Sequence, residues 1–305
     1  MANSKMYFLH ALTPLHVGAG RGLGYIDLPI VREKVMNFPY VPGSSVKGVI
    51  AESFGASEKE RKNNQELKVA FGVSNNEKND SGEKSSNSGS LVFTDARLLC
   101  LPVRSLYGTF AWATSATILQ RFQRDGESIG NKKLNYDIPT INKDSDALVT
   151  KESKVVKDDK IYLEDLDITA RTDALADHWS GYFAEKLFSE DKERDSFKNR
   201  FIILSDNVFN FLCETGTEVS PHIRINDESK TTSDHALWYE EALPTETILS
   251  GVVWCDKIYG DANQNQTDLL DTYTKPKNNI LQFGGKATTG KGIVRFIAEN
   301  EKGGN

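Results

Sequence analysis

The chain has 305 residues, of which 38% are hydrophobic and 26% charged, and its formal net charge is −6. This composition suits a soluble globular protein, and the sequence contains neither a membrane-spanning apolar run nor a signal-peptide pattern. Its three widely spaced cysteines predict reduced core thiols in a cytoplasmic protein rather than a zinc site. The acidic balance argues mildly against nucleic-acid binding, unless the basic residues gather on one face.

The first part of the chain predicts two extended segments and a helix. Residues 5–12 are rich in β-forming side chains and predict a first strand, and residues 25–33 predict a second extended segment. A Pro-Gly turn then leads into a predicted helix over 41–54, with Ser44 or Ser45 as its N-cap.

The middle of the chain begins with a polar insert. Its low apolar content over 56–90 predicts a partly disordered segment. A strongly apolar strand is expected over 90–103, followed by an amphipathic helix over 106–123. Helical spacing recurs over 174–188, and residues 200–214 predict a buried strand, a capped turn and a helix.

The last third predicts mainly strands. Two β-like stretches around a polar tip predict a long β-hairpin over 220–244, and a core strand is expected over 245–260. A glycine-rich turn enters a final strand over 281–299. This order of elements predicts an α+β fold, a ferredoxin-like sheet with large insertions in a single domain over 1–305.

Two glycine-rich loops raise the question of nucleotide binding. The first, GAGRGLG at 18–24, lacks the glycine spacing of a dinucleotide fingerprint, and a strand follows it. The second, GKATTGK at 285–291, matches the start of a P-loop, but Gly292 replaces the Ser or Thr that would hold magnesium. Glycine still lets backbone N–H groups approach a phosphate. These loops and the helix start at 42–48 therefore predict three phosphate sites, with plain turns as the alternative.

A carboxylate inside an apolar segment marks another candidate site. Asp27 stands between Ile26 and Leu28, where a carboxylate costs stability unless it has a partner or a function. An ion pair with Arg21 or Arg32 would give it a purely structural role. A position facing a phosphate would give it a functional one.

Other polar residues also permit two interpretations. His16 is either a satisfied structural histidine or part of a site at the first glycine loop. Asp95 interrupts an apolar strand, which favours a hydrogen-bonding role. In the predicted hairpin, alternation places His222 and Arg224 on one face, opposite the arm LWYEE at 237–241.

Five segments, in order between residues 13 and 296, carry a family resemblance: TPLHVGAGRGLGYIDLPIVRE, FPYVPGSSVKGVI, LVFTDARLLCLPVRSLYGTFAW, HALWYEEALP and FGGKATTGKGIVRF. Together they resemble the RAMP superfamily of CRISPR proteins. The PGSSVKG helix start and the C-terminal glycine loop are general features of that superfamily. The segments IDLPIVRE and LWYEEALP more narrowly resemble the repeating backbone subunit of the type III-B (Cmr) RNA-targeting complex.

The resemblance implies an RRM-like palm with a projecting β-hairpin thumb at 220–245. Copies of such a subunit stack into a helical filament along a guide RNA, beside the other subunits of the complex and without contact to a membrane. The thumb kinks the guide–target duplex at regular intervals, where an aspartate cuts the single-stranded target RNA with a divalent metal ion, Mg²⁺ or Mn²⁺. By motif, that aspartate and metal ligand is Asp27, and the family's loop histidine is His16, which would act as a second catalytic residue by transferring a proton or would simply hold the RNA backbone.

The same resemblance implies supporting and RNA-binding residues. Tyr239, Glu240 and Glu241 would support catalysis at the thumb base. The residues expected to bind RNA lie in the loops, the helix start and the thumb: Gly18, Arg21, Arg32, Ser44, Ser45, Lys47, Arg104, Ser105, His222, Arg224, Gly284, Gly285, Lys286, Thr288 and Lys291.

The chemistry implied is attack by the RNA's own 2′-hydroxyl. A regular A-form helix keeps this oxygen out of line with the phosphorus–oxygen bond, and a flipped-out nucleotide brings it into line. The protein then has to position the RNA, stabilise charge on the phosphate and transfer protons. Two alternatives stay open: a subunit that coats guide RNA without cutting, and a nuclease that matures the guide transcript.

Overall fold

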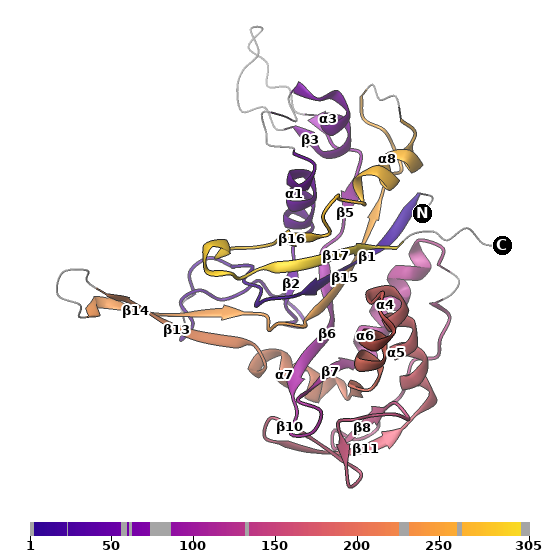
Figure 1. The fold of residues 1–305 in the computed structure, drawn as a ribbon, viewed down its shortest axis with the longest axis vertical. Helices are drawn as coiled ribbons and strands as arrows, with labels where there is room; N and C mark the ends of the chain where they lie inside the picture. Colours follow the sequence, from indigo (N-terminus) through magenta and orange to yellow (C-terminus); the bar gives the residue numbers. More distant parts are fainter. Residues whose placement is uncertain are drawn as a thin grey trace.

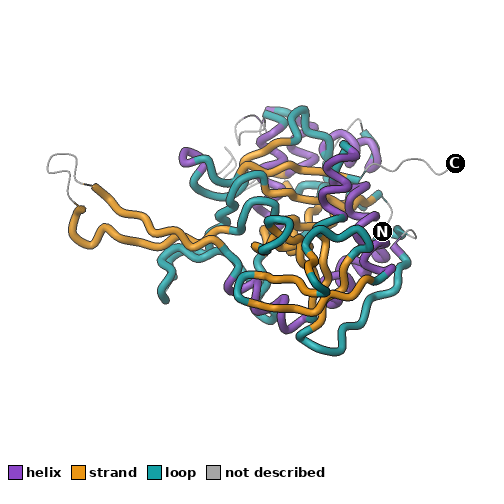
Figure 2. The backbone as a smooth tube through the Cα atoms, turned by 60° about the horizontal axis from the view of Figure 1, so that its bottom comes forward, coloured by secondary structure: helices purple, strands orange, loops and turns teal. Residues whose placement is uncertain are grey.

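The computed structural model describes residues 3–299 except Leu23 and the ranges 56–59, 61–62, 74–86, 132–133, 226–231 and 261–263. Over these residues a large mixed sheet carries helices on its faces, and a long two-stranded arm projects from it (Figures 1 and 2). No helix within this described part is long and apolar enough to cross a membrane.

Four antiparallel strands form the centre of the palm, in the sheet order β17-β1-β15-β6. Along the chain the order is β1, α1, β6, β15, α8 and β17, so one helix follows the first strand and the other precedes the last. This is the β-α-β-β-α-β order of a ferredoxin-like fold, so the predicted α+β class is confirmed. The bounds are β1 Ser4–Ala11, α1 Gly43–Ser53, β6 Ala96–Arg104, β15 Ile248–Trp254, α8 Gln266–Tyr273 and β17 Ile293–Ala298.

A second group of strands extends the sheet beyond β6, and short strands complete its edges. In sheet order the extension contains β7 Phe110–Ser115, β12 Phe201–Leu204, β8 Asp146–Val149, β11 Leu166–Thr172, β10 Lys160–Leu163 and β9 Val156–Lys157. The short strands are β2 Tyr40–Val41, which pairs with β6, β5 Val92–Phe93, which pairs with β15, and β16 Ile280–Gln282, which pairs with β17.

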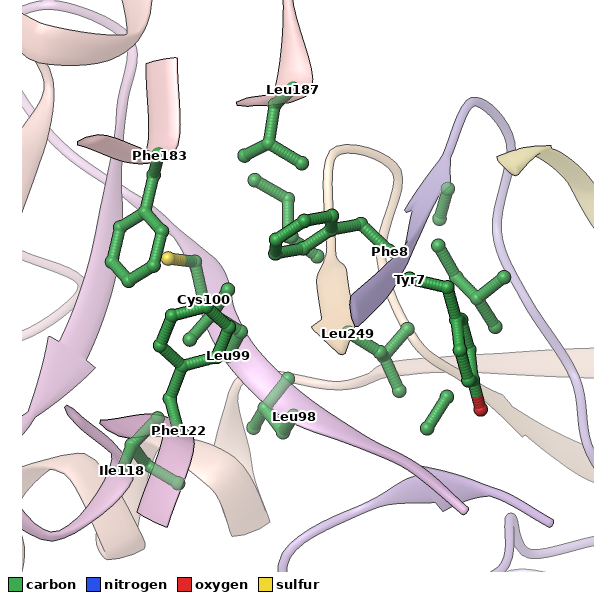
Figure 3. Close-up of a cluster of buried hydrophobic side chains, with 14 of the residues drawn as sticks. Tyr7, Phe8, Leu98, Leu99, Cys100, Ile118, Phe122, Phe183, Leu187 and Leu249 are labelled. Atoms are coloured by element: carbon green, nitrogen blue, oxygen red, sulfur yellow. The ribbon is translucent and has the colours of Figure 1, made fainter. Parts of the chain in front are cut away.

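The core lies between the sheet and two helices, α4 (Ala116–Ser128) and α5 (Ala174–Leu187). Phe8 of β1 contacts Phe122 of α4 with ring centroids 5.9 Å apart, and Phe122 contacts Phe183 of α5 at 5.1 Å (Figure 3). Burial of such large aromatic side chains is the main stabilising contribution to this layer. Between β7 and residue 218 the chain forms α4, α5 and two further helices, α6 Asp191–Lys198 and α7 Asp206–Thr215.

The predicted helix over 106–123 is wrong in its first half. Residues 110–115 form β7, and the helix begins only at Ala116, after the N-cap Ser115. Strand β7 is hydrogen-bonded between β6 and β12, and its residues from Ala111 onward are buried. Tertiary pairing on both sides therefore overrides the local helical pattern.

The expected serine N-cap of α1 is also wrong. The N-cap residue is Pro42, and the side chain of Asp95 accepts a hydrogen bond from the Gly43 backbone nitrogen at 2.8 Å. Asp95 thus stabilises the helix start from the break between β5 and β6, which confirms its structural interpretation.

Part of the predicted polar insert is folded. Helix α3 (Gln65–Phe71) and strand β3 (Gly72–Val73) precede β4 (Asn87–Ser88). Leu67 and Phe71 of α3 are buried against the core. Residues 74–86, on which the expectation of disorder mainly rests, lie outside the described residues.

The predicted hairpin is confirmed and forms the projecting thumb (Figure 2). Strand β13 (Glu218–Ile225) pairs with β14 (Thr232–Ala242), with His222 opposite Trp238. Alternation along the strands places Val219, Ile223 and Tyr239 on one face and His222 on the other. The tip, residues 226–231, lies outside the described residues.

Candidate functional site

Asp27 lies at the root of the thumb, exposed to solvent. Its Oδ2 accepts a hydrogen bond from the Tyr239 backbone nitrogen at 2.8 Å. The following residue joins the two segments, because the Leu28 nitrogen donates to the Tyr239 oxygen at 3.0 Å and the Leu28 oxygen accepts from the Glu241 nitrogen at 3.0 Å. The segment around Asp27 is therefore an added edge on β14, and its carboxylate points away from the core.

Arg32 does not pair with Asp27. Its guanidinium binds Glu241, with Nη2 2.5 Å from Oε1, and also donates to the Cys213 oxygen at 2.9 Å. Since Cys213 lies in the last turn of α7, Arg32 connects the thumb root to the carboxyl end of this helix. These contacts give Arg32 a structural role, and contact with RNA stays a prediction for it.

His16 joins the two glycine-rich loops. Its ring is buried, and Nδ1 lies 2.6 Å from the Glu241 carbonyl oxygen, so Nδ1 carries the proton and donates. The His16 oxygen accepts from the Gly285 nitrogen at 2.9 Å. A Cβ on Gly18 would lie 2.9 Å from Nε2, and one on Gly284 would lie 2.2 Å from the His16 oxygen. Only glycine permits these approaches.

Glu240 is the centre of an ion cluster at the thumb root. Its buried carboxylate accepts from Lys286 Nζ at 2.6 Å and from Trp238 Nε1 at 2.7 Å, with Lys291 Nζ at 3.7 Å and His222 Nε2 at 3.4 Å. Burial alone would raise the pKa of Glu240, but these hydrogen bonds and positive charges outweigh it and lower the pKa to about 2. Glu240 is therefore ionised and is not a proton donor at neutral pH.

The cluster also connects the C-terminal glycine loop to the thumb root, because Lys286 and Lys291 belong to this loop. Lys286 adopts a left-handed backbone conformation with φ +67° at the start of the short 3₁₀ helix η2 (Ala287–Thr289). No α-helix follows the loop, since β17 begins at Ile293, so the P-loop interpretation is excluded. Thr288 is exposed at the top of the loop. Its role in RNA binding stays a prediction.

The structure places the other predicted RNA-binding residues around this centre or on separate elements. Arg21 and Arg224 are exposed in the first loop and on the thumb. Arg104 ends β6 and lines a cavity of about 420 Å³ with Glu218 at the start of the thumb. Its neighbour Ser105 is buried. Residues Ser44, Ser45 and Lys47 lie in the first turns of α1, which packs on β5 and β16.

Sequence reasoning missed two aromatic residues. Trp238 stacks on His222 with ring centroids 5.6 Å apart and an interplanar angle of 17°. The sequence could have indicated this pair, because the register of the predicted hairpin places the two side chains opposite each other on one face. Tyr25 is 99% exposed, two residues before Asp27. It carried no pattern beyond its place in the loop.

A divalent ion at Asp27 would have few protein ligands. Among the described residues no group of three or more His, Cys, Asp or Glu side chains could hold a metal. The neighbouring Glu240 and Glu241 are buried and already bind lysine and arginine. Asp27 is the exposed carboxylate, and Mg²⁺ is commonly bound by one or two carboxylates together with substrate phosphates. The residues therefore fit an ion shared with RNA and do not fit a closed protein site.

Comparisons with known proteins relate the chain to one superfamily. The RAMP superfamily model matches residues 8–295. The chain is 33% identical over 289 residues to the CRISPR system Cmr endoribonuclease Cmr4 of Pyrococcus furiosus, which covers 94% of this chain and 92% of that protein. It is 23% identical over 310 residues to the CRISPR system CMR subunit Cmr4 of Saccharolobus solfataricus, which covers 96% of this chain and 95% of the relative.

Solved structures carry the same fold. A crystal structure of oligomeric Cmr4 from Pyrococcus furiosus has a TM-score of 0.73 and 26% sequence identity, and the match covers 98% of this chain and 99% of that chain. The family match covers almost the whole chain, including the palm, both glycine loops and the thumb. The chain therefore belongs to the RAMP superfamily.

Proposed function

We propose that this chain is the repeating backbone subunit of a type III-B CRISPR ribonucleoprotein, which coats guide RNA and cuts the paired target RNA at regular intervals. Its partners would be guide RNA, target RNA, further copies of itself and the other subunits. The observation that carries the proposal is the exposed carboxylate of Asp27, fixed by the Tyr239 backbone at the root of a projecting hairpin. The similarity to an endoribonuclease of the same superfamily supports it.

The proposed reaction is a transesterification. The 2′-oxygen of a flipped-out nucleotide attacks the adjacent phosphorus, and the bond from phosphorus to the 5′-oxygen of the next nucleotide breaks. The products are a 2′,3′-cyclic phosphate and a 5′-hydroxyl. One proton leaves the 2′-hydroxyl and one is delivered to the departing 5′-oxygen. The protein supplies alignment of the kinked strand, and the guide supplies the sequence specificity.

Asp27 would hold a divalent ion together with the target phosphate. Such an ion would stabilise negative charge on the phosphate oxygens. The side chain is already oriented by the Tyr239 nitrogen, so little reorganisation is needed when RNA arrives. Backbone N–H groups of the glycine loops would position the neighbouring phosphates.

His16 has a defined tautomer in this proposal. Its Nδ1 donates to the Glu241 oxygen, which leaves the lone pair of Nε2, on the side of Gly18, free to accept a proton. Because the ring is buried beneath Gly18, its first task is to hold the two glycine loops together. A catalytic proton transfer by His16 would require RNA to reach Nε2 past this loop.

A non-catalytic coat protein is the second candidate. The Lys286–Glu240–Lys291 cluster is compatible with it, because lysines beside a hairpin would serve RNA coating as well as cutting. A coat protein has no use for an exposed, oriented carboxylate facing a polyanion.

One experiment separates the two functions. The chain is assembled with guide RNA and its partner subunits, and a paired target RNA longer than the guide is added with Mg²⁺. We expect evenly spaced cuts with cyclic-phosphate ends, which stop when a chelator removes the metal. A target that is bound at saturation and stays intact would refute the nuclease and favour the coat protein.

A further inference from the structure

Glu241 has more contacts at the thumb root than a supporting catalytic carboxylate would need. Its side chain is only 4% exposed. Oε2 accepts from the Ile30 nitrogen at 3.0 Å, and Oε1 accepts from Thr217 Oγ1 at 2.9 Å and from Arg32 Nη2 at 2.5 Å. It therefore cannot reach a reacting phosphate, because both oxygens are buried and occupied.

The backbone of the same residue holds both predicted catalytic residues in place. The Glu241 nitrogen donates to the Leu28 oxygen, one residue after Asp27. The Glu241 oxygen accepts from His16 Nδ1 at 2.6 Å. One residue of β14 thus contacts the Asp27 segment on one side and the His16 ring on the other.

The side-chain contacts extend this connection to both ends of the thumb. Thr217 stands directly before β13, the first thumb strand, and Glu241 lies near the end of β14, the second. Through Arg32, the carboxylate is also connected to the Cys213 oxygen in the last turn of α7. A displacement of the thumb root is therefore transmitted to the Asp27 segment through the hydrogen bonds of Glu241, which add to the two that Tyr239 makes with Asp27 and Leu28.

We infer that Glu241 is a positioning residue that fixes Asp27 and His16 relative to the thumb, so that the cut falls where the thumb kinks the duplex. The inference rests on the proposed function. Glu241 would affect cleavage only by positioning Asp27 and His16, and it would take no part in the chemical step.

A carboxylate is required because every neighbour donates. The Ile30 nitrogen, the Thr217 hydroxyl and the Arg32 guanidinium face the two oxygens, and a carboxylate is acceptor-only. In Glu241→Gln the shape is retained, but an amide NH₂ replaces one acceptor and must face at least one of these donors. The variant therefore loosens the Asp27 segment without removing side-chain volume.

The test uses the complete complex and three readouts. Amide hydrogen exchange of residues 26–31 reports the hold on the Asp27 segment, single-turnover cleavage at saturating target reports positioning, and guide affinity reports assembly. For Glu241→Gln we expect exchange at Ile30 to be at least about tenfold faster and cleavage to be about tenfold to a hundredfold slower, with guide affinity changed less than about twofold.

Matched variants separate positioning from general stability. Thr217→Ser keeps the hydroxyl and should behave as wild type, whereas the nearly isosteric Thr217→Val should give a smaller loss of cleavage in the same direction. Asp125→Asn removes the ion pair between Arg97 and Asp125, which lies outside the thumb root. It should lower the unfolding midpoint without changing cleavage at saturation.

Two results would overturn the inference. One is Glu241→Gln cutting at the wild-type rate. The other is a loss of cleavage in Glu241→Gln that merely follows its loss of guide affinity or its lowered unfolding midpoint. In that case Asp125→Asn would lose cleavage for the same drop in unfolding midpoint. A wild-type complex that does not cut refutes the proposed function instead, and the exchange at Ile30 then decides by itself whether Glu241 holds the segment.

Discussion

Removing the charge of Glu240 should weaken the fold and strengthen RNA binding at the same time. Glu240→Gln keeps the shape and an oxygen that can accept from Trp238, but it leaves Lys286 and Lys291 without their counter-charge. A pKa near 2 instead of 4.5 corresponds to about 3 kcal/mol of stability at neutral pH. Lys286 and His222 are 32% and 34% exposed, so solvent screening reduces this to about 1–2 kcal/mol.

The effect on RNA has the opposite sign. A carboxylate about 6 Å from a phosphate in water repels it by about 0.7 kcal/mol, so its removal should tighten guide RNA binding roughly threefold at low salt. The two released lysines should steepen the dependence of log affinity on log salt by about 1.4, at about 0.7 for each phosphate contact on single-stranded RNA. Thermal unfolding and fluorescence anisotropy titrations at several salt concentrations measure both effects on one variant.

The low pKa of Glu240 also predicts a pH dependence. Because its pKa is depressed in the folded state, its contribution to stability is complete above pH 4.5 and is lost as the pH falls towards 2. Glu240→Gln should lack this part of the acid destabilisation.

Glu33→Gln is the matched control for both effects, because it removes an ion pair in which Arg121 is 14% and Glu33 is 18% exposed. Glu33→Gln should lower stability and leave the salt dependence of RNA binding unchanged. If Glu240→Gln also left the salt dependence unchanged, the reasoning about the released lysines would be refuted.

Three further predictions concern the start of helix α1, the thumb and the divalent metal. Asp95→Ala removes the acceptor for the Gly43 nitrogen and should lower the free energy of unfolding by about 1 kcal/mol in a denaturant titration, with cleavage at saturation unchanged; a loss of cleavage would contradict a purely structural role. Replacing residues 226–235 with a two-residue turn should leave guide binding largely intact and abolish the regular cut pattern, and cuts at wild-type positions would exclude the thumb role. Removal of divalent metal by a chelator should stop cleavage and preserve guide binding, so cutting that continues would show that no metal is needed.

Elements with strong local patterns could be predicted from the sequence. The thumb was predictable because period-two stretches flank a polar tip, and α5 was predictable from its apolar spacing. Strand β7 was not, because residues 110–115 continue into a helix and become a strand only through pairing with β6 and β12. Local sequence does not contain that pairing.

The sequence names candidate residues for the site, but it does not contain their contacts. Asp27 and His16 stand out as polar groups in apolar surroundings, and motif resemblance selects the glycine loops. Lys286 was expected to face phosphate, yet it binds Glu240, 46 positions earlier in the chain. Such a pair depends on how the last loop docks on the thumb root, and this arrangement is set by tertiary packing around His16.

The most direct test of the central claim is single-turnover cleavage of guide-paired target RNA by complexes assembled with wild-type chain or with Asp27→Asn. The asparagine keeps a side-chain oxygen for the Tyr239 nitrogen and removes only the charge, so folding and guide affinity should be unchanged. The account predicts a rate about a thousandfold lower at saturating RNA, equivalent to about 4 kcal/mol of lost transition-state stabilisation. Undiminished cleavage by the Asp27→Asn complex would contradict it.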